Sequence, residues 1–193
     1  HRLSIFQPRG TDVDVVLDLM IHDIDIILNL VNSEIASISA AGVPVITEFG
    51  DIANARLEFV NGCVANVTAS RVSTQPMRRF RVYYPDTYLT LDYQEKTAEW
   101  LVKTDEGIEK RPVPVDDHNA LEKELEDFID CALKTVETGE MPPAKVTGRH
   151  GLEALRLAVK ISQELHEHNL KYGFHEEGAF SNPCLFHDEL GAR

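Results

Sequence analysis

Residues 13–31 read as a helix that is apolar almost all the way round, so most of its sides must be covered by protein. Its polar residues recur at steps of four, four, three and four. At about 100° per residue they fall within an arc of roughly 80°. We call these residues the polar stripe: Asp14, Asp18, His22, Asp25 and Asn29. Burying carboxylates and an imidazole is costly unless partners compensate, so the polar stripe is a candidate functional surface.

The rest of the chain separates strands from helices. Period-two alternation and turn residues predict strands at 2–7, 35–45, 52–60, 63–70, 79–84, 87–93, 98–103 and 108–115. Asn61-Gly62 is a strong hairpin signal, and Thr11 or Asp12 is expected to cap the first helix. Apolar residues at helical spacing predict two later helices, within 121–136 and 152–165. This order indicates an α+β fold, with a large, predominantly antiparallel (mixed) open sheet and helices packed on one face.

The composition of the chain excludes several classes of binding partner. The formal net charge is −13, from 19 basic and 32 acidic residues. Nucleic acid and anionic membranes select basic surfaces, so neither is expected as a partner. No run approaches the ~18 apolar residues that a membrane-spanning helix needs. Three scattered cysteines, Cys63, Cys131 and Cys184, fit a reducing cytoplasm better than a disulfide framework.

Three segments carry a family resemblance, and they lie at residues 9–25, 68–73 and 143–148. The first includes the pattern Asp18-x-x-x-His22-x-x-Asp25. Together with the many-stranded sheet and the two closing helices, they resemble the C-terminal domain of Gfo/Idh/MocA oxidoreductases over residues 1–170. Within the family, the sequences of these segments are most similar to the branch that oxidises the 3-hydroxyl of UDP-N-acetylglucosamine.

The resemblance implies a sugar or sugar-nucleotide dehydrogenase that uses NAD or NADP. In the family, an Asp and a His four residues apart on this helix line the active site, which assigns those places to Asp18 and His22. Imidazole exchanges protons near neutral pH, so His22 is expected to be the base or proton relay and Asp18 its partner. We expect Arg9, Asp25 and Arg71 to contact the substrate, since guanidinium groups hold diphosphates and sugars well.

The resemblance also implies that the cofactor and the substrate are bound by different domains. The family has a nucleotide-binding Rossmann domain with a Gly-rich loop and a Glu-Lys-Pro motif upstream. No GxGxxG occurs in this sequence, and Glu95-Lys96 is followed by Thr97. We therefore expect residues 1–170 to be the substrate and oligomerisation domain, inactive alone, and 171–193 to be a C-terminal tail. Aromatic residues on the sheet are candidates for homo-oligomer contacts: Phe80, Tyr84, Tyr88, Tyr93 and Trp100.

Alternatives remain open from the residues alone. A histidine on an apolar helix is usually a hydrogen-bonded core residue, and neighbouring carboxylates can be its structural acceptors. Asp18, His22 and Asp25 have the chemistry of metal ligands, but no second cluster supplies the remaining ligands, so no metal site is expected. The same fold could also serve as a non-catalytic dimerisation or ligand-sensing module.

Overall fold

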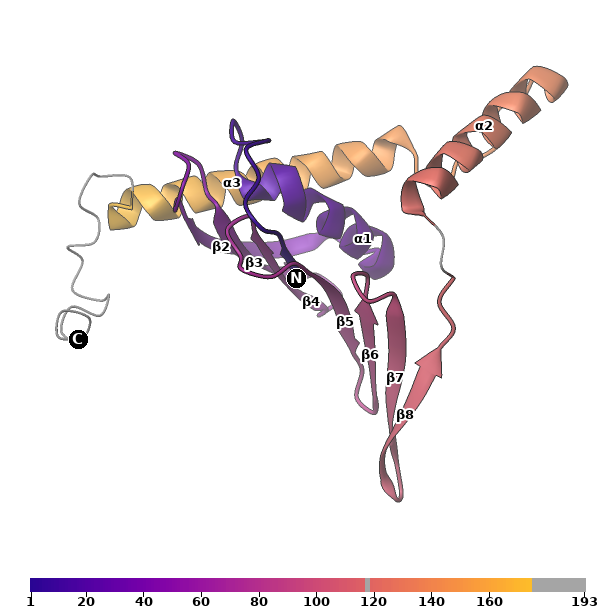
Figure 1. Cartoon of the computed structure of the whole chain (residues 1–193), viewed down its shortest axis with the longest axis horizontal. Helices are drawn as coiled ribbons and strands as arrows, with labels where there is room; N and C mark the ends of the chain where they lie inside the picture. Colours follow the sequence, from indigo (N-terminus) through magenta and orange to yellow (C-terminus); the bar gives the residue numbers. More distant parts are fainter. Residues whose placement is uncertain (117–118, 175–193) are drawn as a thin grey trace. The chain divides into compact units, whose positions relative to one another are not determined.

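A computed structural model describes residues 1–116 and 119–174 of the chain. The chain divides into two compact units. Of the described residues, the α1 unit contains Arg2–Gln75 and 154–174, and the α2 unit contains His1 and the described part of Pro76–Glu153. Each unit has its own strands, which Figure 1 colours along the sequence.

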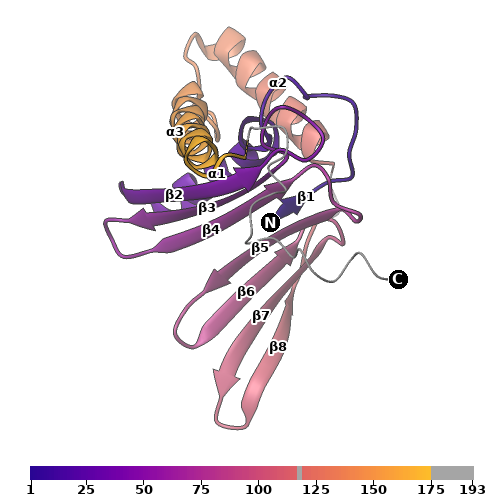
Figure 2. The ribbon, with the colours of Figure 1, turned by 90° about the vertical axis from the view of Figure 1, so that its left-hand side faces the viewer.

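The α1 unit is an open sheet covered on one face by two helices. Its strand order is β2-β3-β4-β1. The strands are β1 (Arg2–Leu3), β2 (Ile35–Val43), β3 (Ile52–Phe59) and β4 (Val64–Ser70). All neighbours pair antiparallel except β1 and β4, which are parallel, with Arg2 opposite Ala69. Helices α1 (Ile21–Val31) and α3 (Gly148–Tyr172, of which the part from Ala154 belongs here) lie on the same face of β2, β3 and β4 (Figure 2).

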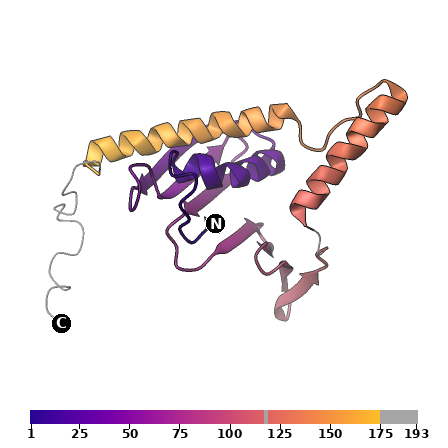
Figure 3. The ribbon, with the colours of Figure 1, turned by 45° about the horizontal axis from the view of Figure 1, so that its top comes forward.

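The core of the α1 unit lies between this face and the two helices. α3 runs alongside α1 (Figure 3) and buries one apolar stripe, Ala154, Leu157, Ala158, Ile161 and Leu165. A glycine in β2 allows the close approach of α3. A Cβ on Gly42 would come within 2.7 Å of the Leu165 side chain and 2.2 Å of the Ile52 carbonyl oxygen. Any larger residue at this position would push the helix or the neighbouring strand away.

The hairpin between β3 and β4 forms where Asn61-Gly62 predicts it. Gly62 has a φ of +85°, whereas Asn61 is not among the residues with positive φ. Phe59 donates its amide to the Cys63 carbonyl, and Gly62 donates to the Phe59 carbonyl. The loop therefore has three residues and ends in a left-handed glycine, rather than the two-residue turn in which both positions have positive φ.

The α2 unit has a meander of four antiparallel strands and one helix. The strands are β5 (Met77–Tyr83), β6 (Thr87–Asp92), β7 (Thr97–Thr104) and β8 (Gly107–Val113), paired in chain order. α2 (Ala120–Thr138) begins at Asn119, whose side chain accepts the Leu121 amide, and it ends at Gly139 in the left-handed conformation. No residue of α2 is buried.

The eight described strands and three α-helices confirm the α+β class and the predominantly antiparallel, mixed open sheet. The predicted elements all exist, but β1 is only two residues long and α3 extends beyond its predicted range at both ends. Within the described part of the chain, no helix is long and apolar enough to cross a membrane.

The start of the first helix differs from the prediction. Residues Val16–Met20 form a π turn, in which Ile21 donates its amide to the Val16 carbonyl. The cap is neither Thr11 nor Asp12, because the Asp14 carboxylate accepts the amides of Val16 and Leu17 at 3.0 Å each. A π turn holds one more residue than an α turn, so the uniform 100° step used for the polar stripe does not hold across it.

Candidate functional site

The first member of the polar stripe, Asp14, is buried and has a structural role. One carboxylate oxygen caps the helix, and the other accepts the hydroxyl of Ser162 on α3. The carboxylate therefore ties the beginning of the first helix to α3. A negative charge is also favourable at this end of a helix because of the helix dipole.

Asp18 is half-buried and lies against the loop that precedes the helix. Gly10 in that loop has a φ of +63°, and a Cβ at this position would lie 3.1 Å from an Asp18 carboxylate oxygen. Only glycine combines this backbone conformation with so close an approach. The loop backbone thus lies against the Asp18 carboxylate on one side.

His22 is exposed on α1, one turn after Asp18. It is not a buried core histidine, so the structural alternative for this residue does not describe its surroundings. Asp25 is half-buried, and its side-chain and backbone oxygens accept the amide of Asn29 at 3.2 and 2.8 Å. One side of the helix thus presents two carboxylates and an imidazole that are at least partly accessible, from Asp18, His22 and Asp25.

The two arginines expected to contact substrate lie in contrasting places. Arg9 is exposed in the loop before the first helix. Arg71 is 3% exposed, and its guanidinium donates to the carbonyls of Gly10 at 2.7 Å and Val13 at 2.8 Å. Two of its donors are thus used inside the protein to hold the loop that carries Arg9 and contacts Asp18. Direct contact between Arg71 and a substrate stays a prediction.

A buried carboxylate that the sequence analysis missed, Asp51, supports this arrangement. Its side chain is fully buried and accepts the amides of Val45, Ile46 and Thr47 and the hydroxyl of Thr47. Burial by itself raises the pKa of Asp51, but these hydrogen bonds outweigh it and the pKa is lowered from its ordinary value. One carboxylate oxygen also lies 3.6 Å from Nε of Arg71. The charge of Asp51 therefore compensates the buried guanidinium.

A second missed pair joins the sheet to α1. Arg2 in β1 donates from Nε and Nη2 to the two carboxylate oxygens of Asp23, at 3.2 and 2.9 Å. Asp23 is 8% exposed, and it lies on the covered side of α1, next to His22 in sequence but not in the polar stripe. A charged residue among buried aliphatic positions is the sequence signal that could have identified it.

Metal binding finds no support in the positions of these groups. Among residues 1–116 and 119–174, no three His, Cys, Asp or Glu side chains gather where they could hold a metal ion.

Comparison with known proteins assigns this domain to a family. Residues 5–89 match the family model for the GFO/IDH/MocA C-terminal domain. The chain carries a GFO/IDH/MocA C-terminal domain. This confirms the resemblance drawn from the sequence, and the matched range contains the polar stripe, Asp51 and Arg71.

Among curated relatives, the UDP-N-acetylglucosamine 3-dehydrogenase of Acidithiobacillus ferrooxidans is 38% identical over 137 residues. The match covers 68% of this chain and 44% of the relative. A solved structure of the same enzyme has a TM-score of 0.77 at 33% identity, covering 86% of this chain and 52% of that one. The chain thus spans about half the length of these relatives.

More distant solved structures share the fold alone. Levoglucosan dehydrogenase in complex with NADH has a TM-score of 0.69 at 13% identity, covering 86% of this chain and 55% of that one. The fold of the domain is therefore retained at an identity too low to carry information about substrate.

Proposed function

We propose that this chain is the substrate-binding and oligomerisation half of an NAD(P)-dependent dehydrogenase that oxidises a ring hydroxyl of a UDP-hexosamine. The observation that carries the proposal is the 38% identity to a UDP-N-acetylglucosamine 3-dehydrogenase. The exposed imidazole of His22, one helical turn after Asp18, gives the reaction a proton acceptor.

Oxidation of a secondary alcohol removes a proton from oxygen and a hydride from carbon. In the proposed reaction His22 accepts the hydroxyl proton. Asp18, which lies against the Gly10 loop, is proposed to stabilise the imidazolium that results, because a nearby carboxylate favours the charged form. Arg9 and Asp25 flank this pair and are proposed to bind the substrate through its diphosphate and hydroxyl groups.

Arg71 enters the proposal chiefly as a positioning residue. Its guanidinium holds the carbonyls of Gly10 and Val13 and is itself neutralised by Asp51. The loop that these contacts hold also includes Arg9, next to Gly10, and lies against Asp18. A group that fixes the first helix and its loop in one geometry supports catalysis by reducing the motion of the reacting groups.

The nicotinamide cofactor would receive the hydride when bound. This chain supplies an acid–base pair and a surface for the substrate. Its sequence contains no Gly-rich loop that could bind the phosphates of the cofactor. We therefore propose that NAD or NADP is held mainly by a nucleotide-binding domain outside this chain, and that the chain alone does not turn over substrate. A cytoplasmic homo-oligomer assembled through the sheet completes the proposal.

The test uses the complete enzyme with UDP-N-acetylglucosamine and NAD or NADP, following reduced nicotinamide by absorbance. His22→Asn should lower kcat by about 10²- to 10⁴-fold, the usual contribution of a positioned acid–base group. Glu34→Gln, at an exposed position just after the end of α1 and outside the polar stripe, is the control and should retain turnover near the wild-type level. Asp18→Asn should shift the pH profile of the remaining activity, which a purely structural change would leave in place.

Two outcomes would contradict the proposal. Wild-type turnover in His22→Asn would remove the assigned proton acceptor. Binding of a sugar nucleotide without any reduction of NAD or NADP would favour the non-catalytic sensing module instead.

A further inference from the structure

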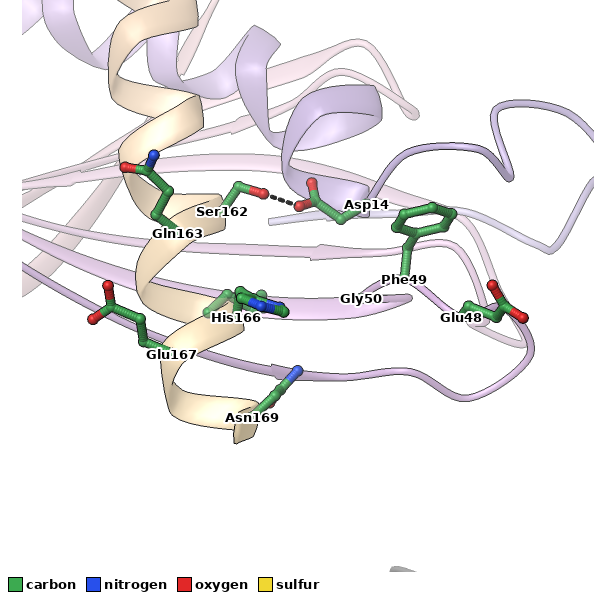
Figure 4. Close-up of a pocket in the computed structure, with 10 residues that line it drawn as sticks. Asp14, Glu48, Phe49, Gly50, Ser162, Gln163, His166, Glu167 and Asn169 are labelled. Carbon is green, nitrogen blue, oxygen red and sulfur yellow. Dashed lines mark hydrogen bonds between the residues drawn. The ribbon is translucent and has the colours of Figure 1, made fainter. Parts of the chain in front are cut away.

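The α1 unit contains a cleft between α3 and the loop that precedes β3. It has a volume of about 490 Å³, within the usual range for small-molecule sites. Its walls come from Ser162, His166 and Asn169 on α3, from Glu48 to Gly50 in the loop, and from Asp14 (Figure 4). His22 and Asp18 do not line it, so it is separate from the proposed catalytic surface.

Asn169 is the most unusual residue of this cleft. Its side chain is 1% exposed, yet among the residues that the structure describes neither Oδ1 nor Nδ2 has a hydrogen-bond partner. Figure 4 shows its amide directed from α3 toward the side of the cleft formed by the loop. Buried amides almost always have partners, because leaving one unpaired destabilises the folded state. A ligand that both accepts from Nδ2 and donates to Oδ1 would satisfy it.

The charges around the cleft restrict that ligand. Three of the lining residues are carboxylates, Asp14, Glu48 and Glu167, and no lysine or arginine is among the lining residues. A phosphate or carboxylate would be repelled, whereas a cation would be attracted. Phe49, 42% exposed, offers an aromatic ring at the loop side, and such rings also attract cations. A metal ion is not supported, because no three ligating side chains of the described residues converge.

We propose that this cleft binds a small organic cation that carries an ammonium group close to a hydroxyl or carbonyl oxygen. The ammonium donates to Oδ1 of Asn169 and is stabilised by the carboxylates, while the ligand oxygen accepts from Nδ2. The inference does not depend on the proposed dehydrogenase activity, because none of the proposed catalytic residues lines the cleft.

The experiment measures binding of three sugars of the same size and different charge to the full chain by calorimetry or NMR titration. The probes are glucosamine as the cation, glucose as the neutral analogue and glucuronate as the anion. Glucosamine should bind at least about tenfold more tightly than glucose, as expected for one additional charge-assisted contact, and glucuronate should not bind.

Two variants locate the site. Asn169→Leu should weaken glucosamine binding by about tenfold or more, while raising the melting temperature of the free protein, because it removes an unpaired buried amide. Glu48→Gln, in an exposed loop position where folding is not at risk, should weaken binding several-fold. Glu164→Gln is the matched control, since Glu164 is exposed on α3 but does not line this cleft.

The proposal is overturned if glucosamine fails to bind, or if glucose or glucuronate binds equally well. It is also overturned if Asn169→Leu and Glu48→Gln bind glucosamine like the wild type, because general attraction to an acidic protein would then explain the result. If Asn169→Leu merely unfolds, Glu48→Gln against Glu164→Gln still decides the question.

Discussion

The two units of this chain differ in how much apolar surface they bury. In the α1 unit, buried residues such as Leu57, Ile24 and Ile161 form a continuous core. In the α2 unit, Ala98 is the one buried hydrophobic residue among those described, and α2 exposes Phe128 and Val136 at 71% and 84%. The α1 unit therefore carries its own stabilisation, whereas the amphipathic pattern of α2 requires something outside its own unit to bury it.

One charged pair from each unit gives a second contrast. Arg71 and Asp51 form a pair whose side chains are 4% and 0% exposed. Arg111 and Glu109 in β8 form one whose side chains are 55% and 51% exposed. Buried pairs are sensitive to the loss of either partner, whereas exposed pairs contribute little because water and salt screen them. Of these two pairs, the one in the α1 unit fixes the geometry of a loop, whereas the one in the α2 unit lies in solvent.

The largest effect should come from breaking the buried pair. Arg71→Leu leaves the Asp51 carboxylate uncompensated and releases the carbonyls of Gly10 and Val13. We expect a loss of about 3–5 kcal/mol in the free energy of unfolding, measured by chemical denaturation. Arg111→Leu is the matched control and should produce no measurable change. Similar losses in the two variants would break the distinction between the units.

A smaller effect should follow from a cavity in the core. Ile161 is fully buried on α3 and Ile108 is 75% exposed in β8. Ile161→Ala should cost about 2–5 kcal/mol, by lost burial and an incompletely filled cavity. Ile108→Ala should change the free energy of unfolding by less than about 0.5 kcal/mol, as surface substitutions usually do. If Ile108→Ala proves equally costly, the α2 unit has a core of its own that its exposed residues do not reveal.

Acid should weaken the α1 unit through Asp51. Because its pKa is lowered in the folded state, the unfolded chain binds the proton more readily. The stability that Asp51 contributes is therefore present above the pKa of an unfolded aspartate, ~3.9, and is lost as the pH falls through the lower folded value. Denaturation of wild type and Asp51→Asn at several pH values should show a shallower acid dependence in the variant, even at high salt. Equal acid slopes would contradict this role of Asp51.

The smallest effect on stability is expected on α2. Phe128→Ser removes an exposed aromatic ring and should change the free energy of unfolding by less than about 0.5 kcal/mol. It should, however, reduce self-association of the chain at high concentration, measured by light scattering, because exposed apolar faces associate. A large loss of stability would show that the apolar face of α2 is covered within the isolated chain.

The sequence predicts well where local rules decide the structure. Asn61-Gly62 marks the hairpin, and Gly139 ends α2, because left-handed backbone positions favour glycine and asparagine. Strand alternation and helical spacing also predict the α+β class. These signals depend on residues a few positions apart, and they survive in almost any tertiary setting.

The site is less predictable because its supports come from distant segments. Asp51 owes its role to the amides of Val45 to Thr47 and to Arg71, a combination that no spacing reveals. Arg71 looks like a surface ligand from the sequence and proves to be buried. Alternation also does not reveal which faces of the β5–β8 strands are covered within the chain.

The π turn at Val16–Met20 has a further consequence for how this helix can change. Deleting one residue inside the turn would restore ordinary α-helical hydrogen bonding, and the helix could remain continuous. The residues of α1 would then be rotated about the helix axis, relative to the Asp14 contact with α3, by about the 100° that one residue contributes. The additional residue therefore sets the direction in which His22 points around the helix axis, relative to the Asp14–Ser162 contact that holds the helix on α3.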